Sequence, residues 1–120
     1  MIVFDDQSLK PIFIQIADWV EDEIIKKTIK EGDQIPSTNQ FAAQFQINPA
    51  TAGKGINRLV EDGIIYKKRG IGMFVEEGAF QRVQTKRRKR FETEVVAMML
   101  EEAKKIGIDK KELIEMIEKQ

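Results

Sequence analysis

Two helix start signals lie close together in this chain and constrain its fold more than any other feature. Ser37 followed by Gln40 is a capping-box pattern, with Ser37 as the N-cap and Gln40 as the third helical residue. Asn48 followed by Pro49 is a second start, because Asn caps helices well and Pro suits the first helical turn. Only residues 46–47 separate the two predicted helices. The pattern therefore predicts a helix-turn-helix.

Apolar residues at helical spacing predict the neighbouring elements. A helix is expected to start at Pro11 and to bury one stripe: Ile12, Ile16, Trp19, Val20 and Ile24. Lys26, Lys27 and Lys30 lie near its end, and Gly32 closes it or the turn after it. The helix from Pro49 is expected to stop at Gly63 and to bury four residues: Ala52, Ile56, Leu59 and Val60.

Extended segments flank these helices. Residues 2–4 are β-prone and residues 5–8 have turn composition, while Ile35 before Pro36 is expected to be extended. Residues 64–68 and 73–76 are β-rich, and a glycine-bearing tip at 69–72 separates them. This arrangement predicts a β-hairpin.

The C-terminal part has helical spacing again. After a predicted linker at 77–79, a charged helix is expected to run to Gly107, and Asp109 with Glu112 indicates a second helix start. The stripes of these helices supply the residues predicted for dimerisation: Phe91, Val95, Met98, Met99, Ile106, Leu113 and Ile117. The fold class is therefore mainly α with a small β-hairpin. We expect a winged helix-turn-helix in residues 1–77 and a C-terminal two-helix dimerisation arm in residues 78–120.

Composition narrows the function classes. The chain has no Cys and no His, which removes disulfides, Cys-ligated zinc, catalytic triads and imidazole proton shuttles. We expect no enzymatic activity, no cofactor and no metal. The longest apolar run, residues 95–100, is far shorter than a membrane span, and the N-terminus lacks the pattern of a signal peptide. The sequence therefore predicts a cytoplasmic protein without a membrane segment.

The formal net charge is zero, but the charge is unevenly distributed. Residues 1–34 carry a net charge of −4, residues 35–75 carry +3, and residues 76–120 carry +1. The last segment includes a basic run, Lys86–Arg90, whose role the sequence leaves open. An acidic start and a basic middle suit a protein that presents one face to a polyanion.

Several spaced motifs resemble the GntR family of bacterial transcription regulators over about residues 10–76. They occur in family order: Gly32–Ser37, Phe41–Ala42, Ile47–Ala52, Leu59–Ile65 and Arg69–Val75. The short helical tail is similar to the YtrA subfamily, which lacks a large effector domain. The resemblance implies a dimeric repressor that binds a palindromic DNA operator. The regulated genes in that subfamily often include a transporter operon and the regulator's own gene.

The physics of the residues agrees with a DNA interface. A helix N-terminus attracts phosphate, and a basic side chain one turn further reaches a base edge or the backbone. The hairpin is expected to act as a wing, in which an Arg senses minor-groove width. The residues predicted to contact DNA are Ser37, Asn39, Asn48, Pro49, Ala50, Thr51, Lys54, Arg58, Lys68, Arg69 and Gly70.

The chain departs from the family pattern at two positions. Asn39 stands where relatives commonly carry Arg, and Gly53 stands where they frequently carry Arg or a polar residue. The usual guanidinium groups that read guanine are therefore missing. We expect a preference that leans to A·T pairs or to DNA shape. Gly53 and Gly55 allow close approach of α-helical backbone, either to DNA or to the rest of the domain. A capping role alone would also explain the presence of Ser37 and Asn48, without any contact to DNA.

An alternative function stays open at this point. A winged helix also serves as a protein–protein module that does not touch DNA, and the neutral net charge and missing arginines favour that slightly. Steep salt dependence would separate the two, because phosphate contacts release counterions. The sequence does not decide whether a small-molecule effector exists or where it binds.

Overall fold

The computed structural model describes residues 4–5 and 9–120. The chain divides into two compact units, residues 1–84 and 85–120, and each is described by itself. Most of the β-prone segment at 2–4 and of the turn at 5–8 lies outside the described residues. Phe4 is described, and its ring packs 5.5 Å from that of Phe45 at the edge of the core.

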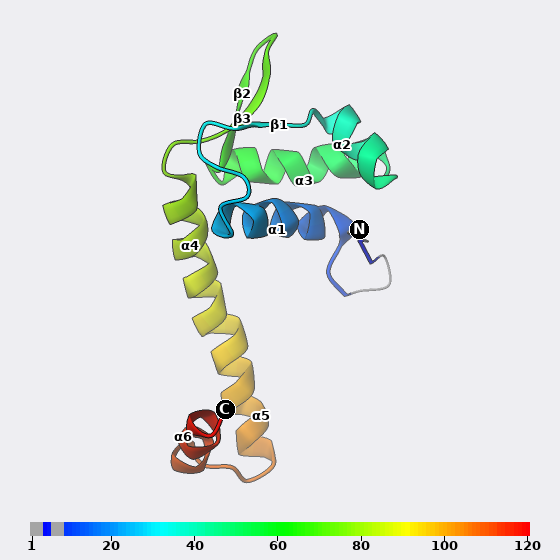
Figure 1. Cartoon of the computed structure of the whole chain (residues 1–120). Helices are drawn as coiled ribbons and strands as arrows, with labels where there is room; N and C mark the ends of the chain where they lie inside the picture. Colours follow the sequence, from blue (N-terminus) through cyan, green and yellow to red (C-terminus); the bar gives the residue numbers. More distant parts are fainter. Residues whose placement is uncertain (1–3, 6–8) are drawn as a thin grey trace. The chain divides into compact units, whose positions relative to one another are not determined.

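The first unit contains the predicted helix-turn-helix (Figure 1). Ser37 Oγ accepts from the Gln40 backbone N–H at 3.1 Å, and Gln40 Oε1 accepts from Ser37 N–H at 3.0 Å, so the capping box is confirmed. Asn48 Oδ1 accepts from the Ala50 N–H at 2.8 Å, which confirms the second cap. The helices of this unit are α1 (Ile12–Ile25), α2 (Thr38–Phe45), α3 (Pro49–Glu61) and the start of α4 (Ala79–Arg90).

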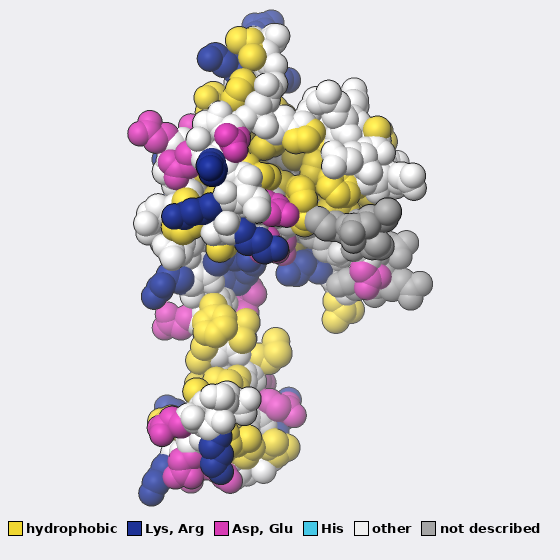
Figure 2. Space-filling model, viewed as in Figure 1, with side chains coloured by type: hydrophobic (Ala, Val, Ile, Leu, Met, Phe, Trp, Pro, Cys, Tyr) yellow, Lys and Arg dark blue, Asp and Glu magenta, His cyan; other side chains and the backbone are white. Residues whose placement is uncertain are grey.

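The predicted hairpin is part of a three-stranded antiparallel sheet in the order β1-β3-β2. Its strands are β1 (Gln34–Ile35), β2 (Ile65–Lys68) and β3 (Gly72–Val75). The sequence predicts an extended chain at Ile35 but no strand, and β1 forms because β3 offers it an edge: Ile35 pairs with Met73. Basic side chains gather at the far end of the β2–β3 hairpin (Figure 2).

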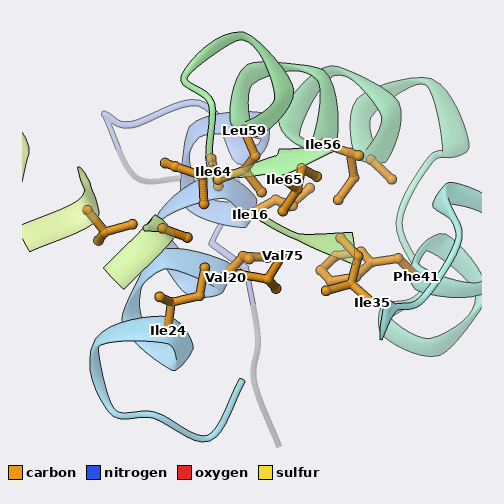
Figure 3. Packing of buried hydrophobic residues seen from close by; sticks show 14 of the residues in the cluster. Ile16, Val20, Ile24, Ile35, Phe41, Ile56, Leu59, Ile64, Ile65 and Val75 are labelled. Atoms are coloured by element: carbon orange, nitrogen blue, oxygen red, sulfur yellow. The ribbon is translucent and has the colours of Figure 1, made fainter. Parts of the chain in front are cut away.

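The core of the first unit lies between α1, α3 and the sheet (Figure 3). The labelled residues there are Ile16, Val20, Ile24, Ile35, Phe41, Ile56, Leu59, Ile64, Ile65 and Val75. The prediction that Val60 is buried is wrong, because this side chain is 38% exposed. At about 100° per residue, Val60 lies beside the stripe formed by Ile56 and Leu59, at the edge of the buried face of the helix.

One glycine allows α1 and α3 to pack closely. A Cβ built on Gly55 would lie 2.8 Å from the carbonyl oxygen of Phe13 and 2.9 Å from Ile16 Cγ2. Gly53 is different, since its nearest neighbour would be Thr38 Cγ2 at an ordinary 3.6 Å. Of the two explanations for these glycines, close packing within the domain therefore accounts for Gly55.

The first turns of α4 are fixed to the winged unit. Ala79 and Val83 are fully buried in its core. Glu31 accepts hydrogen bonds from the backbone N–H groups of Gly78 at 2.8 Å and Phe80 at 3.2 Å, so it caps α4 from a distant loop. Arg82 Nη1 donates to the carbonyl oxygen of Gly63 at 2.8 Å. The linker predicted at 77–79 is therefore shorter, because Ala79 already belongs to the helix.

The second unit contains the rest of the helical tail, with η1 (Phe91–Val96), α5 (Ala97–Lys105) and α6 (Lys110–Glu118). The sequence predicts one continuous α-helix up to Gly107, but residues 91–96 form a π-helix. Thr93 Oγ1 donates to the carbonyl oxygen of Lys89 at 3.1 Å, and hydrogen bonds of this kind often bend helices. Gly107, at φ 77°, ends α5, and Asp109 caps α6 through the N–H of Glu112 at 2.8 Å.

Candidate nucleic-acid interface

The starts of α2 and α3 share one surface of the first unit. The Cβ position of Gly53, one turn into α3, faces Thr38 at the start of α2. Ser37 and Asn39 therefore lie next to the beginning of α3, and both are exposed. Two helix N-termini on one surface concentrate partial positive charge from backbone N–H groups, which favours an anion there.

The predicted contact residues of α3 lie outside its buried stripe. Asn48, Pro49, Ala50, Lys54 and Arg58 are exposed, and Thr51 is half-buried. The Lys54 ammonium lies 4.7 Å from the centre of the Phe13 ring. An exposed cation–π contact of this kind contributes only about 0.5–1 kcal/mol, so the side chain remains available to a stronger acceptor.

The β2–β3 hairpin presents the other predicted contact residues. Lys68, Arg69 and Gly70 are exposed at its end, where Gly70 adopts φ 78° in the turn. Gln34 Nε2 donates to the carbonyl oxygen of Ile71 at 3.2 Å and so braces the tip from β1. Sequence reasoning missed Gln34, because its contact depends on a strand pairing between residues distant in sequence.

The residues predicted for dimerisation differ in burial: one is buried and six are exposed. Within residues 85–120, all of which the structure describes, only Ala103 and Leu113 are buried. Leu113 thus packs within its own unit. The other six predicted residues are exposed: Phe91, Val95, Met98, Met99, Ile106 and Ile117. Figure 2 shows hydrophobic side chains at the surface of this unit.

None of the helices in residues 4–5 and 9–120 is long and apolar enough to span a membrane. Over the same residues, the structure contains no group of three or more Asp and Glu side chains placed to hold a metal ion.

The comparisons with known proteins agree on one family. The family described as "Bacterial regulatory proteins, gntR family" matches residues 14–75. The chain is 32% identical over 111 residues to the uncharacterized HTH-type transcriptional regulator YhcF of Bacillus subtilis, covering 92% of this chain and 90% of YhcF. It is 35% identical over 79 residues to the HTH-type transcriptional repressor YtrA of the same organism, covering 66% of this chain and 61% of YtrA.

A solved structure extends the likeness to the whole chain. A GntR family transcriptional regulator from Listeria monocytogenes matches with a TM-score of 0.79 and 29% identity, covering 98% of this chain and 99% of the other. The match includes the helical tail, so the winged helix-turn-helix and the C-terminal helices recur together. On these grounds the chain belongs to the GntR family, among its short YtrA-like members, and is a DNA-binding transcriptional regulator and not an enzyme.

Proposed function

We propose that the protein is a dimeric repressor that binds a palindromic operator, with residues 1–77 contacting DNA and residues 78–120 joining two copies. The observation that supports the dimer is that eight large apolar side chains of residues 85–120 are exposed within the single chain, and exposed apolar surface of this kind often marks an interaction site. The name of YtrA, a repressor, supports the direction of regulation. The family resemblance supports operators beside a transporter operon and the protein's own gene.

In this proposal α3 enters the major groove with its N-terminal turn. Ser37 and Asn48 mark two helix starts that face phosphates, while Asn39 and Lys54 reach base edges. An Asn amide pairs with adenine through two hydrogen bonds, so Asn39 supports an A·T-leaning preference. Arg58 contacts the backbone, and Pro49, Ala50 and Thr51 line the groove.

The hairpin supplies the second contact in this proposal. Lys68 and Arg69 lie where a wing approaches the minor groove, and Gly70 lets the backbone come close. The hydrogen bond from Gln34 to Ile71 restrains the tip, and a restrained tip loses less entropy on binding.

The test is selection of bound duplexes from a random DNA library, followed by titration of the selected duplex in rising salt. We expect an inverted repeat whose half-sites lie about one helical turn, roughly 34 Å, or a multiple apart. Affinity is expected to fall with a log–log slope near −0.9 per phosphate contact. Absence of enrichment with folded protein, or affinity independent of salt, would contradict the proposal.

Asn48→Asp is expected to separate the capping role from the DNA role. Asp caps a helix as well as Asn does, so thermal stability should remain within about 0.5 kcal/mol of the parent. The new charge would face a phosphate, and operator affinity should fall about tenfold or more. Thermal unfolding and fluorescence anisotropy measure the two effects. Unchanged affinity together with unchanged stability would assign Asn48 to capping alone.

Met98→Glu is expected to weaken the dimer. Met98 is 66% exposed within the single chain, so a charge there costs the monomer little, whereas burial against a second copy leaves that charge unpaired. The dimer dissociation constant should rise about tenfold or more, as followed by sedimentation. Lys111→Glu, which changes charge at an exposed polar site of α6, is the matched control and should leave it unchanged.

A further inference from the structure

A hollow of about 300 Å³ opens on the first unit, where α1 ends and α4 begins. Ile24 is buried, while Ile29 and Phe80 are half-buried, so these three residues give the hollow an apolar floor. The other lining residues are Lys27, Lys30 and Glu31, all exposed. A space of this size suits a small organic molecule.

The end of α1 brings two cations to this floor. Lys27 adopts a left-handed conformation at φ 64°, which ends the helix, and the N–H of Ile29 then turns back to the carbonyl oxygen of Glu23 at 3.2 Å. The Lys27 ammonium lies 4.8 Å from the centre of the Phe80 ring. In the described part of the chain, the ammonium groups of Lys27 and Lys30 make no ion pair with a carboxylate.

The carboxylate in the lining is already engaged. Glu31 accepts the N–H groups of Gly78 and Phe80 at the start of α4. Its charge is therefore directed at the helix end, and the two lysines leave the hollow with an excess of one positive charge. An apolar floor with unpaired cations at its rim is complementary to a molecule that has an apolar body and one anionic group.

We propose that this hollow binds a small organic anion, with the anionic group at Lys27 and Lys30 and the apolar body on Ile24, Ile29 and Phe80. Phe80 belongs to the first turn of α4, so an occupant contacts both the end of α1 and the start of the helix that leads into the arm. The site shares no residue with the proposed DNA interface. Its test does not depend on whether the chain represses transcription or dimerises.

Phenylacetate, 2-phenylethanol and inorganic phosphate are the probes, and amide NMR shifts of Lys27, Lys30, Gly78 and Phe80 are the readout. Phenylacetate joins a carboxylate to an apolar ring, the alcohol lacks the charge, and phosphate lacks the apolar body. We expect saturable shifts with phenylacetate, with a dissociation constant on the order of 1 mM. The alcohol and phosphate should bind at least about tenfold more weakly.

The double variant Lys27→Asn/Lys30→Gln removes both charges, and Asn tolerates the left-handed conformation at position 27. It should weaken phenylacetate binding about tenfold, whereas Lys26→Gln, at the exposed neighbour outside the hollow, should not. Equal binding of alcohol and acid, absence of saturation, or undiminished binding by the folded double variant would overturn the proposal. The comparison of the three probes on the unsubstituted protein tests it even if the variant fails to fold.

Discussion

Gly55→Ala is expected to destabilise the protein by about 2 kcal/mol, although alanine is the better helix former. A Cβ at this position would lie 2.8 Å from a backbone oxygen of α1, so the two helices must move apart. Overpacking of this kind costs about 1–3 kcal/mol, and contact with a backbone oxygen of another helix places the cost at the upper end. A gain of about 1 kcal/mol in helix propensity offsets only part of it. Thermal or urea unfolding measures the difference, which should lower the melting temperature by roughly 10 °C.

Gly53→Ala is the matched control for that experiment, two positions earlier in the same helix. Its Cβ would meet only Thr38 Cγ2 at 3.6 Å, so the propensity gain is expected to remain. Stability should rise by up to about 1 kcal/mol. Equal effects of the two substitutions would show that α1 and α3 can separate without cost, contrary to the packing described above.

The double variant Lys54→Ala/Arg69→Ala is expected to bind the selected operator about 100-fold more weakly. Each basic side chain in contact with DNA contributes on the order of 1–3 kcal/mol, and the two residues lie on different elements, so their effects should nearly add. Arg69→Ala alone should lower the magnitude of the salt slope by about 1. Lys54→Ala alone should also relax preference at one base position if the ammonium leaves Phe13 for a base edge.

Lys26→Ala is the control for these variants. It removes the same charge from an exposed position at the end of α1, outside the proposed interface. Long-range electrostatics alone would weaken binding equally in the control and in the single variants. That result would mean that Lys54 and Arg69 attract DNA without contacting it.

The local features of the fold could be predicted from the sequence because their causes are local. The two caps, the short helices and the hairpin each depend on residues within one turn or one strand of each other. The burial of Val60 was predicted wrongly, since the period of a helix locates a stripe but not its edges. Strand β1, the brace from Gln34 and the close contact at Gly55 all need the tertiary structure, because their partners are distant in sequence.

For the candidate site, the sequence indicated which residues lie at the surface, while their contacts with DNA stay a prediction. Of the residues that the sequence singled out for DNA contact, all are exposed in the structure except Thr51, which is half-buried. What the sequence could not indicate is that the Lys54 side chain rests on a ring from α1, or that Leu113 lies within its own unit. The variants described above test which of these residues touch DNA or a second copy.

Because α4 is anchored in the winged unit, the segment needed for folding ends later in the chain than the segment proposed to contact DNA. A chain cut after residue 77 would keep every residue proposed to contact DNA, yet it would lose Ala79 and Val83 from the core and the guanidinium of Arg82 from the end of α3. The helix that leads away to the arm is therefore also the last piece of the winged unit. Any exchange of arms between relatives, by evolution or by design, has to splice within that helix and not before it.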